Sequence, residues 1–296
     1  MTIQGLLLQF LTGLSRAAVL FIVASGLSLV FGALRIVNIA HGSFYMLGAF
    51  VATTMVAMAG GWMGFPLALV AAALVGAVLA AGVETTVLRR LYGREHLLQL
   101  LATFAVLLII GDLTRFLWGE QARSVRQPAL LRGPIRLSLG DSILVFPRYS
   151  LFLIVVALLL AWGLSLLINR TGLGRDIRAA VSDPEMLDMV GVNVPRLFTS
   201  VFVLGAALAA VGGVLAAPQS TVLLGLDVDI IIEAFAVVII GGLGSLKGTA
   251  VGALLVGLTF AFGILLVPGA ALVIVFLVMA AVLVWRPSGL FGVPER

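Results

Sequence analysis

Apolar runs dominate the chain, and their lengths predict the fold. Nine stretches favour α-helices, at residues 5–32, 44–59, 65–88, 97–117, 150–168, 198–217, 229–241, 248–267 and 270–285. A bilayer core about 30 Å thick needs about 20 apolar residues for one helical span. We therefore expect an all-α, polytopic membrane helical bundle of about eight or nine transmembrane helices, with residues 1–296 forming a single transmembrane domain.

Two of these stretches differ from a simple span in length. The run 5–32 is too long for one straight span and contains Arg16, which favours an interfacial helix followed by a span from about Ala17. The run 229–241 is short, which is typical of a half-helix. We expect some broken or re-entrant segments in the bundle.

Composition supports a membrane protein and excludes other classes. Of the 296 residues 62% are hydrophobic and 10% charged, and the mean hydropathy is +1.23, far outside the soluble range. The net charge of +5 comes from arginines in loops, without interleaved aromatics, so nucleic-acid binding is not expected. Cysteine is absent, which excludes disulfides and thiolate chemistry. We expect no cleaved signal peptide, because residues 1–14 lack Lys and Arg.

The loop charges predict an orientation. Eleven of the 18 Lys and Arg residues fall on one side if that side holds 33–43, 89–96, 169–197, 242–247 and 286–296. The positive-inside bias makes this the cytoplasmic side. The opposite, periplasmic side then carries 118–149, whose prolines and glycines favour irregular structure or a small hairpin.

A first group of polar residues interrupts the apolar pattern after residue 32. Its members are Asn38, His41, Gly42, Ser43 and Tyr45. Lipid cannot satisfy such groups, so a break at membrane depth is tolerated only against protein or a water-filled cavity, as in transporters with unwound helices. The alternative is a plain cytoplasmic turn, which the neighbouring Arg35 favours.

A second interruption is rich in glycine and comprises Gly241, Gly242, Gly244 and Ser245. It is not a Walker A loop, because Lys247 is neither preceded by glycine nor followed by Ser or Thr. A tight turn between two membrane segments is the simpler interpretation. We predict that the two interruptions together line a translocation pathway.

The stretch 169–197 predicts a short helix outside the membrane, at about 184–190. Asp183 is suited to the N-cap, Pro184 to the first helical position and Gly191 to a left-handed end. The helix has an apolar face made of Met186, Leu187, Met189 and Val190. Such a face marks a partner surface, or it packs back on the membrane helices of its own chain.

Candidate chemistry inside the spans is sparse. The ionisable residues there are Arg16, Glu84, Asp112, Arg115 and Glu233, all predicted to lie toward helix ends. A proton- or sodium-coupled carrier usually holds acidic groups near the midplane, so we expect the energy for transport to come from elsewhere. No carboxylates at ligand spacing accompany His41 or His96, and no hydrolase or protease motif is present. We expect no metal site and no enzyme.

Three stretches together resemble the LivH-type permease of branched-chain amino acid ABC importers, a group that also serves urea and short amides. They are Gly32 to Tyr45, Gly174 to Asn193, and Gly241 to Ser245, and the resemblance covers nearly the whole chain. It implies a multi-pass subunit of the bacterial inner membrane. Two departures leave the substrate open, since Ser43 stands where the family often has Glu and Lys247 where it often has Pro.

The resemblance also implies partners. They are a second, homologous permease in a homodimer or, as we expect, a heterodimer, two cytoplasmic ABC ATPase subunits that bind ATP and Mg, and a periplasmic solute-binding protein; this chain itself holds no cofactor. The segment 169–197 becomes the ATPase-coupling surface, through Arg175, Arg178, Asp183, Pro184, Glu185, Met186, Leu187, Met189 and Gly191. The alternative is a stand-alone secondary carrier or channel for a small polar solute, which would move solute without ATPase subunits.

Overall fold

The computed structural model describes residues 3–60, 63–139 and 142–292, and most of them are helical. The α-helices are α1 (Ile3–Leu34), α2 (His41–Ala59), α3 (Gly64–Thr86), α4 (His96–Trp118), α5 (Arg148–Arg170), α6 (Gly172–Ser182), α7 (Pro184–Met189), α8 (Val194–Ala216), α9 (Leu226–Gly241), α10 (Leu246–Leu266) and α11 (Ala271–Trp285). Short 3-10 turns are η1 (Leu88–Leu91), η2 (Ala129–Leu131) and η3 (Pro268–Ala270). All nine predicted apolar helices are present, which confirms the all-α membrane bundle.

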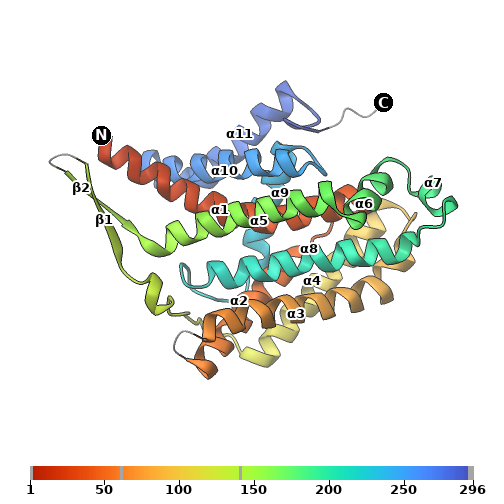
Figure 1. The fold of residues 1–296 in the computed structure, drawn as a ribbon, viewed down its shortest axis with the longest axis horizontal. Coiled ribbons are helices and arrows are strands. Elements are labelled where there is room, and N and C mark those ends of the chain that lie inside the picture. Colours follow the sequence, from red (N-terminus) through yellow and green to blue (C-terminus); the bar gives the residue numbers. More distant parts are fainter. Residues whose placement is uncertain (1–2, 61–62, 140–141, 293–296) are drawn as a thin grey trace.

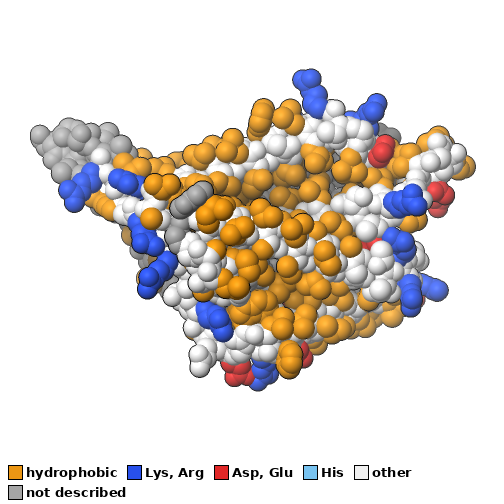
Figure 2. All heavy atoms as spheres, turned by 60° about the horizontal axis from the view of Figure 1, so that its bottom comes forward, with side chains coloured by type: hydrophobic (Ala, Val, Ile, Leu, Met, Phe, Trp, Pro, Cys, Tyr) orange, Lys and Arg blue, Asp and Glu red, His pale blue; other side chains and the backbone are white. Residues whose placement is uncertain are grey.

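The long helices run roughly side by side along the long axis of the molecule (Figure 1). Eight helical stretches in the described part of the chain are long and apolar enough to cross a membrane. The N-terminus and the strands β1 (Pro134–Leu139) and β2 (Ser142–Pro147) lie at one end, which we call the hairpin end, and α6 and α7 lie at the other, the α6–α7 end (Figure 1). Figure 2 shows a broad hydrophobic surface between them, with Lys and Arg side chains around its edges.

Two extramembrane features can be compared with the sequence. The predicted small hairpin is present, as an antiparallel pair in which Pro134 lies opposite Pro147. The predicted short helix is present as α7. Helix α6 was not predicted, because its 11 residues are too few for a membrane span and include the charged Arg175, Asp176 and Arg178.

Helix α1 is one continuous helix of 32 residues. The expectation of an interfacial helix that ends before Ala17 is therefore wrong. Arg16 lies near the middle of α1, where its guanidinium is 2.6 Å from a carboxylate oxygen of Glu233. Because the charge is neutralised by a neighbouring helix, Arg16 does not have to reach the membrane surface.

The connection between α1 and α2 re-enters the bundle. Helix α1 ends at Leu34, and the next residue, Arg35, adopts a left-handed conformation with φ of 54°. Helix α2 begins at His41. The Nε2 atom of His41 lies 2.9 Å from the carbonyl oxygen of Val23, about 16 Å back along α1 at 1.5 Å per residue. The part of the break that holds Asn38 and His41 is therefore buried inside the bundle, whereas Arg35 is exposed, as a turn at the surface would have it.

Helix α9 differs from its neighbours in length and direction. Its 16 residues span about 24 Å, less than the roughly 30 Å of a bilayer core, as the predicted half-helix implied. It contacts α1, α2, α10 and α11, and it lies across the long helices in Figure 1. Helix α9 thus packs against the N-terminal helices α1 and α2 as well as the C-terminal helices α10 and α11.

Small residues allow the central helices to pack closely. A Cβ atom at Gly26 of α1 would lie only 2.5 Å from the carbonyl oxygen of Gly205 in α8. Between α2 and α8, a Cβ atom at Gly48 would overlap the backbone of Ala210, and one at Gly213 would overlap the backbone of Tyr45. Close backbone approach of this kind replaces the hydrophobic effect as the source of packing energy between helices in lipid.

We expect Gly48→Leu to destabilise the bundle by about 1–3 kcal/mol or more, because the added side chain must push α2 away from α8. Gly163→Leu is the matched control, since nothing lies within 4 Å of a Cβ atom at Gly163. Thermal unfolding of the purified variants in detergent checks this. Equal unfolding temperatures for the two variants would contradict the close α2–α8 contact.

Candidate translocation pathway and coupling surface

The polar residues of the first break are buried in the bundle. The side chains of His41 and Ser43 are fully buried, and Asn38 is 1% exposed. Thr103 of α4 holds the unwound backbone, because its hydroxyl is 3.3 Å from the carbonyl oxygen of Val37 and 3.3 Å from the amide nitrogen of Ile39. The protein itself thus provides the partners that lipid cannot provide.

Two polar atoms in this break have no hydrogen-bond partner among the described residues. They are the Oδ1 atom of Asn38 and the Nδ1 atom of His41. A buried polar atom without a partner costs about 1–3 kcal/mol, so such atoms in a native structure require an explanation. A polar group arriving from outside the chain would relieve both.

The second break lies beside the end of α1. A Cβ atom at Gly32 would be 3.1 Å from the Cα atom of Gly244. Ser245 caps α10 by accepting a hydrogen bond of 3.1 Å from the amide of Gly248, and Gly241 packs on the Gly248 backbone. The structure therefore brings the two predicted interruptions to opposite ends of the same α1 segment.

The other predicted pathway residues have different surroundings. Gly42 packs directly on the backbone of Asp227 at the start of α9. Gly242 packs on the C-terminal segment near Gly289. Tyr45 is 6% exposed and lies on α2 against α8. Seven of the nine predicted residues are thus buried and form no open channel wall within the single chain, whereas Gly244 is exposed and Ser245 is half-buried. We call the nine predicted residues together the band.

Two acidic residues of α9 contact residues of α1 and α2, and the sequence did not predict these contacts. The Ser43 hydroxyl donates to the Asp227 carboxylate at 3.3 Å, and Glu233 pairs with Arg16 at 2.6 Å. The expectation that Arg16 and Glu233 lie toward helix ends is wrong, because both lie within their helices and neutralise one another. The available signal was the spacing of three acidic residues, Asp227, Asp229 and Glu233, before an apolar run.

A cavity of about 350 Å³ lies beside this ion pair. It is bounded by α9, α10, η3 and α11, and its lining residues are Asp229, Ile232, Glu233, Phe260, Pro268, Gly269, Ala271 and Leu272. The Arg16 guanidinium carbon lies 3.5 Å from the centre of the Phe260 ring, a cation–π geometry. A second, smaller cavity of about 190 Å³ lies near Arg35, Tyr92 and Gln99.

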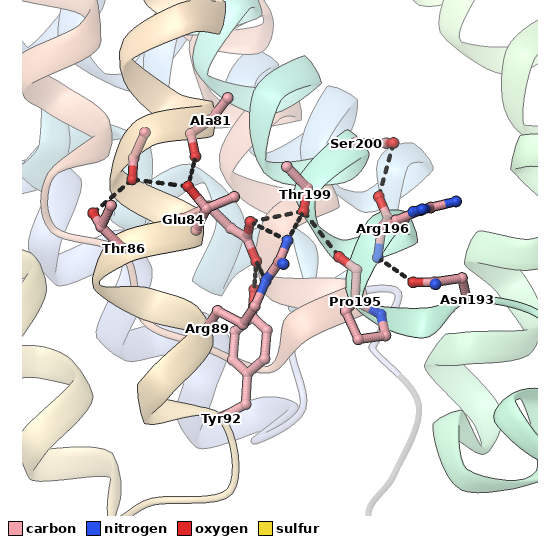
Figure 3. A network of polar contacts seen from close by, with 12 residues as sticks. Ala81, Glu84, Thr86, Arg89, Tyr92, Asn193, Pro195, Arg196, Thr199 and Ser200 are labelled. Carbon is pink, nitrogen blue, oxygen red and sulfur yellow. Dashed lines mark hydrogen bonds and ion pairs between the residues drawn. The ribbon is translucent and has the colours of Figure 1, made fainter.

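A buried polar network joins α3 to α8 near the α6–α7 end (Figure 3). Glu84 is fully buried, and its carboxylate accepts hydrogen bonds from Arg89 at 3.1 Å, Tyr92 at 2.7 Å and Thr199 at 2.7 Å. Burial, together with the hydrogen bond to Glu84, raises the pKa of Tyr92. Glu84 lies at a helix end and is paired there, as expected from the sequence.

The predicted capping of α7 is correct in detail. The Asp183 carboxylate accepts a hydrogen bond of 2.9 Å from the Met186 amide, Pro184 begins the helix, and Gly191 has φ of 89°. Leu187 is 7% exposed and packs on its own chain, whereas Met189 is 74% exposed.

At the α6–α7 end, the predicted apolar face of α7 is therefore partly buried against its own chain and partly exposed. Met186, Met189 and Val190 are 54%, 74% and 70% exposed, and Arg175, Arg178 and Glu185 are also exposed. An apolar patch rimmed by charges is typical of a protein-binding surface. Arg35 ties this end to α1, since its guanidinium donates to the carbonyl oxygen of Val181 at 3.0 Å.

Comparison with known proteins places these features in one family. Residues 9–283 match the family described as the branched-chain amino acid transport system permease component. The high-affinity branched-chain amino acid permease BraD of Pseudomonas aeruginosa is 32% identical, over 97% of this chain and 96% of its own length. LivH of Escherichia coli is 28% identical over 97% and 96%, and a probable LivH of Methanocaldococcus jannaschii is 30% identical over 93% and 89%. No solved structure matches.

We expect Glu84→Ala to destabilise the protein by about 1–3 kcal/mol, because it leaves the half-buried hydroxyl of Tyr92 and part of the Arg89 guanidinium without an acceptor. The matched control is Glu120→Ala. Glu120 pairs with Arg115, but these side chains are 63% and 60% exposed, so its loss should cost less than about 1 kcal/mol. Denaturant titration in mixed micelles checks the difference, and similar losses for both variants would contradict it.

Proposed function

Because this chain belongs to the branched-chain amino acid transport permease family and is a multi-pass membrane protein, we propose that it moves branched-chain amino acids as the permease subunit of an ABC importer. A related small amino acid or amide is included in the proposed substrate class. The observation that carries the proposal is the family match over residues 9–283. The buried break between α1 and α2 supports it, because an unwound segment inside a bundle is typical of transport pathways.

We assign the pathway to the band formed by the two breaks. Asn38, His41 and Ser43 provide polar atoms there, and Asn38 and His41 each hold a buried atom without a described partner. Within one chain the band is closed by packing. A pathway therefore requires movement of α9 or α2, or a contribution from the second permease.

The α6–α7 end is assigned to the cytoplasm and to the ATPase subunits. Its exposed Met186, Met189 and Val190 would enter a groove of the partner, while Arg175 and Glu185 at the rim would fix the orientation. ATP and Mg would bind to those partner subunits, and this chain would transport solute rather than carry out catalysis.

The hairpin end is assigned to the periplasm, where a solute-binding protein would deliver the substrate. The location is the bacterial inner membrane, with lipid around the hydrophobic surface of Figure 2. A second, homologous permease would complete the pore, and we propose a heterodimer.

Transport in proteoliposomes tests the function. The permease assembled with its twin, the two ATPases and the binding protein should accumulate leucine only when ATP is present on the ATPase side. Proteoliposomes that hold the permease alone are the control and should not accumulate leucine. Equal leucine entry in the control would instead show a stand-alone carrier or channel.

The coupling surface is tested by the double variant Met186→Ser/Met189→Ser. We expect its affinity for the ATPase subunits to fall by about tenfold or more, since loss of apolar anchors at an interface costs on the order of 1–2 kcal/mol, with ATP-driven uptake falling in parallel. Met58→Ser is the matched control, because Met58 is 77% exposed on a different helix. Deletion of 184–190 should abolish uptake but not membrane insertion. Wild-type uptake by that deletion would refute the assignment.

A further inference from the structure

We propose that the 350 Å³ cavity beside α9 is a recognition subsite for the charged groups of an α-amino acid. Glu233 and Asp229, which line the cavity, receive the ammonium group. Arg16 receives the carboxylate from beside the cavity, where it pairs with Glu233 and stacks on Phe260. The proposal rests on the proposed function and deepens it, because it names the part of the substrate that this chain recognises.

The first argument is the position of the ion pair. Arg16 and Glu233 lie within helices of a membrane bundle, where charged groups are costly and in most cases mark a substrate or ion site. Removing two charges from water costs more than their attraction returns unless the geometry is excellent. The pair is therefore weak as a device for stability and well suited to exchange partners with a charged ligand.

The second argument is that the Arg16 guanidinium has hydrogen-bond donors left for a ligand. Arginine has five N–H donors, and the hydrogen bond at Arg16 to a side chain is the one from its Nη2 atom to Glu233. Its Nε atom is buried and has no partner among the described residues. Stacking on Phe260 fixes the guanidinium plane while leaving donors at its edge, the arrangement that binds a carboxylate in a bidentate way.

The third argument is the lining of the cavity. Its volume lies within the range of about 300–1,000 Å³ that is typical of small-molecule sites. The exposed side chains of Ile232 and Leu272 contribute apolar surface to the lining, as does Phe260. The cavity lining thus offers two anions and an apolar surface, and the neighbouring Arg16 adds a cation beside Glu233. Together they match the ammonium, side chain and carboxylate of an aliphatic amino acid.

The first turn of α9 contributes to both the cavity and the first break. Asp229 lines the cavity, and Asp227 in the same turn accepts the hydrogen bond from Ser43. Negative side chains are favoured there by the helix dipole.

Equilibrium binding of radiolabelled leucine to the assembled transporter in lipid nanodiscs, without the solute-binding protein, tests the subsite. The double variant Glu233→Gln/Asp229→Asn should bind leucine about tenfold or more weakly, because charge-assisted hydrogen bonds to the ammonium are lost. Asp112→Asn is the matched control, since it neutralises an exposed carboxylate of the membrane helix α4 and should bind normally. Isopentylamine and 4-methylpentanoate, which each keep one charged group, should compete more weakly than unlabelled leucine.

The charge-swapped variant Arg16→Glu/Glu233→Arg separates recognition from structure. It keeps an ion pair between α1 and α9, so its thermal stability should be higher than that of Arg16→Glu alone. Leucine binding should remain lost, because the positive and negative charges have exchanged places relative to Asp229. Wild-type leucine affinity in the swap or in the double variant, or no saturable binding by the wild type, would overturn the subsite. Leucine uptake by the wild-type assembly with its binding protein is measured in parallel, so that failure of the proposed function is seen separately.

Discussion

One constraint organises this structure: a polar group at membrane depth must find its partner inside the protein, because lipid provides none. Polar groups within the apolar helices have such partners at three places. Thr103 holds the unwound backbone after α1, Arg16 and Glu233 neutralise one another, and Glu84 gathers three donors in its buried network. Among the described residues six buried side-chain atoms are left without a partner. Those of Asn38, His41 and Arg16 lie in or beside the regions assigned to solute, and the others belong to Ser15, Ser28 and Gln99.

Helix packing follows from the same constraint. Because lipid is as apolar as the helices, close contact must come from shape, and glycines in α1, α2, α8 and α10 let backbones touch. This close packing brings the main chains of α2 and α9 together at Gly42 and Asp227. The position of the charged residues of α9 is thus set by residues that carry no charge.

The sequence predicted the helices well, since hydrophobic runs report directly on burial in lipid. It also predicted α7, because Asp183, Pro184 and Gly191 have local roles that do not depend on the rest of the fold. It failed where the answer depended on a distant partner. Arg16 was expected at a surface because Glu233 lies 217 residues away, and the depth of the first break required the contact of His41 with Val23.

Helix α1 gives the two proposed sites a common element. It carries Arg16 beside the α9 cavity, offers the Val23 carbonyl to His41 in the break, and ends at Leu34, next to Arg35, whose guanidinium bonds to the backbone near the end of α6. Contacts with both proposed sites are thus made by one continuous helix. An interfacial helix ending before Ala17, the arrangement expected from the sequence, would have placed Arg16 on a different helix from the Val23 carbonyl that His41 contacts.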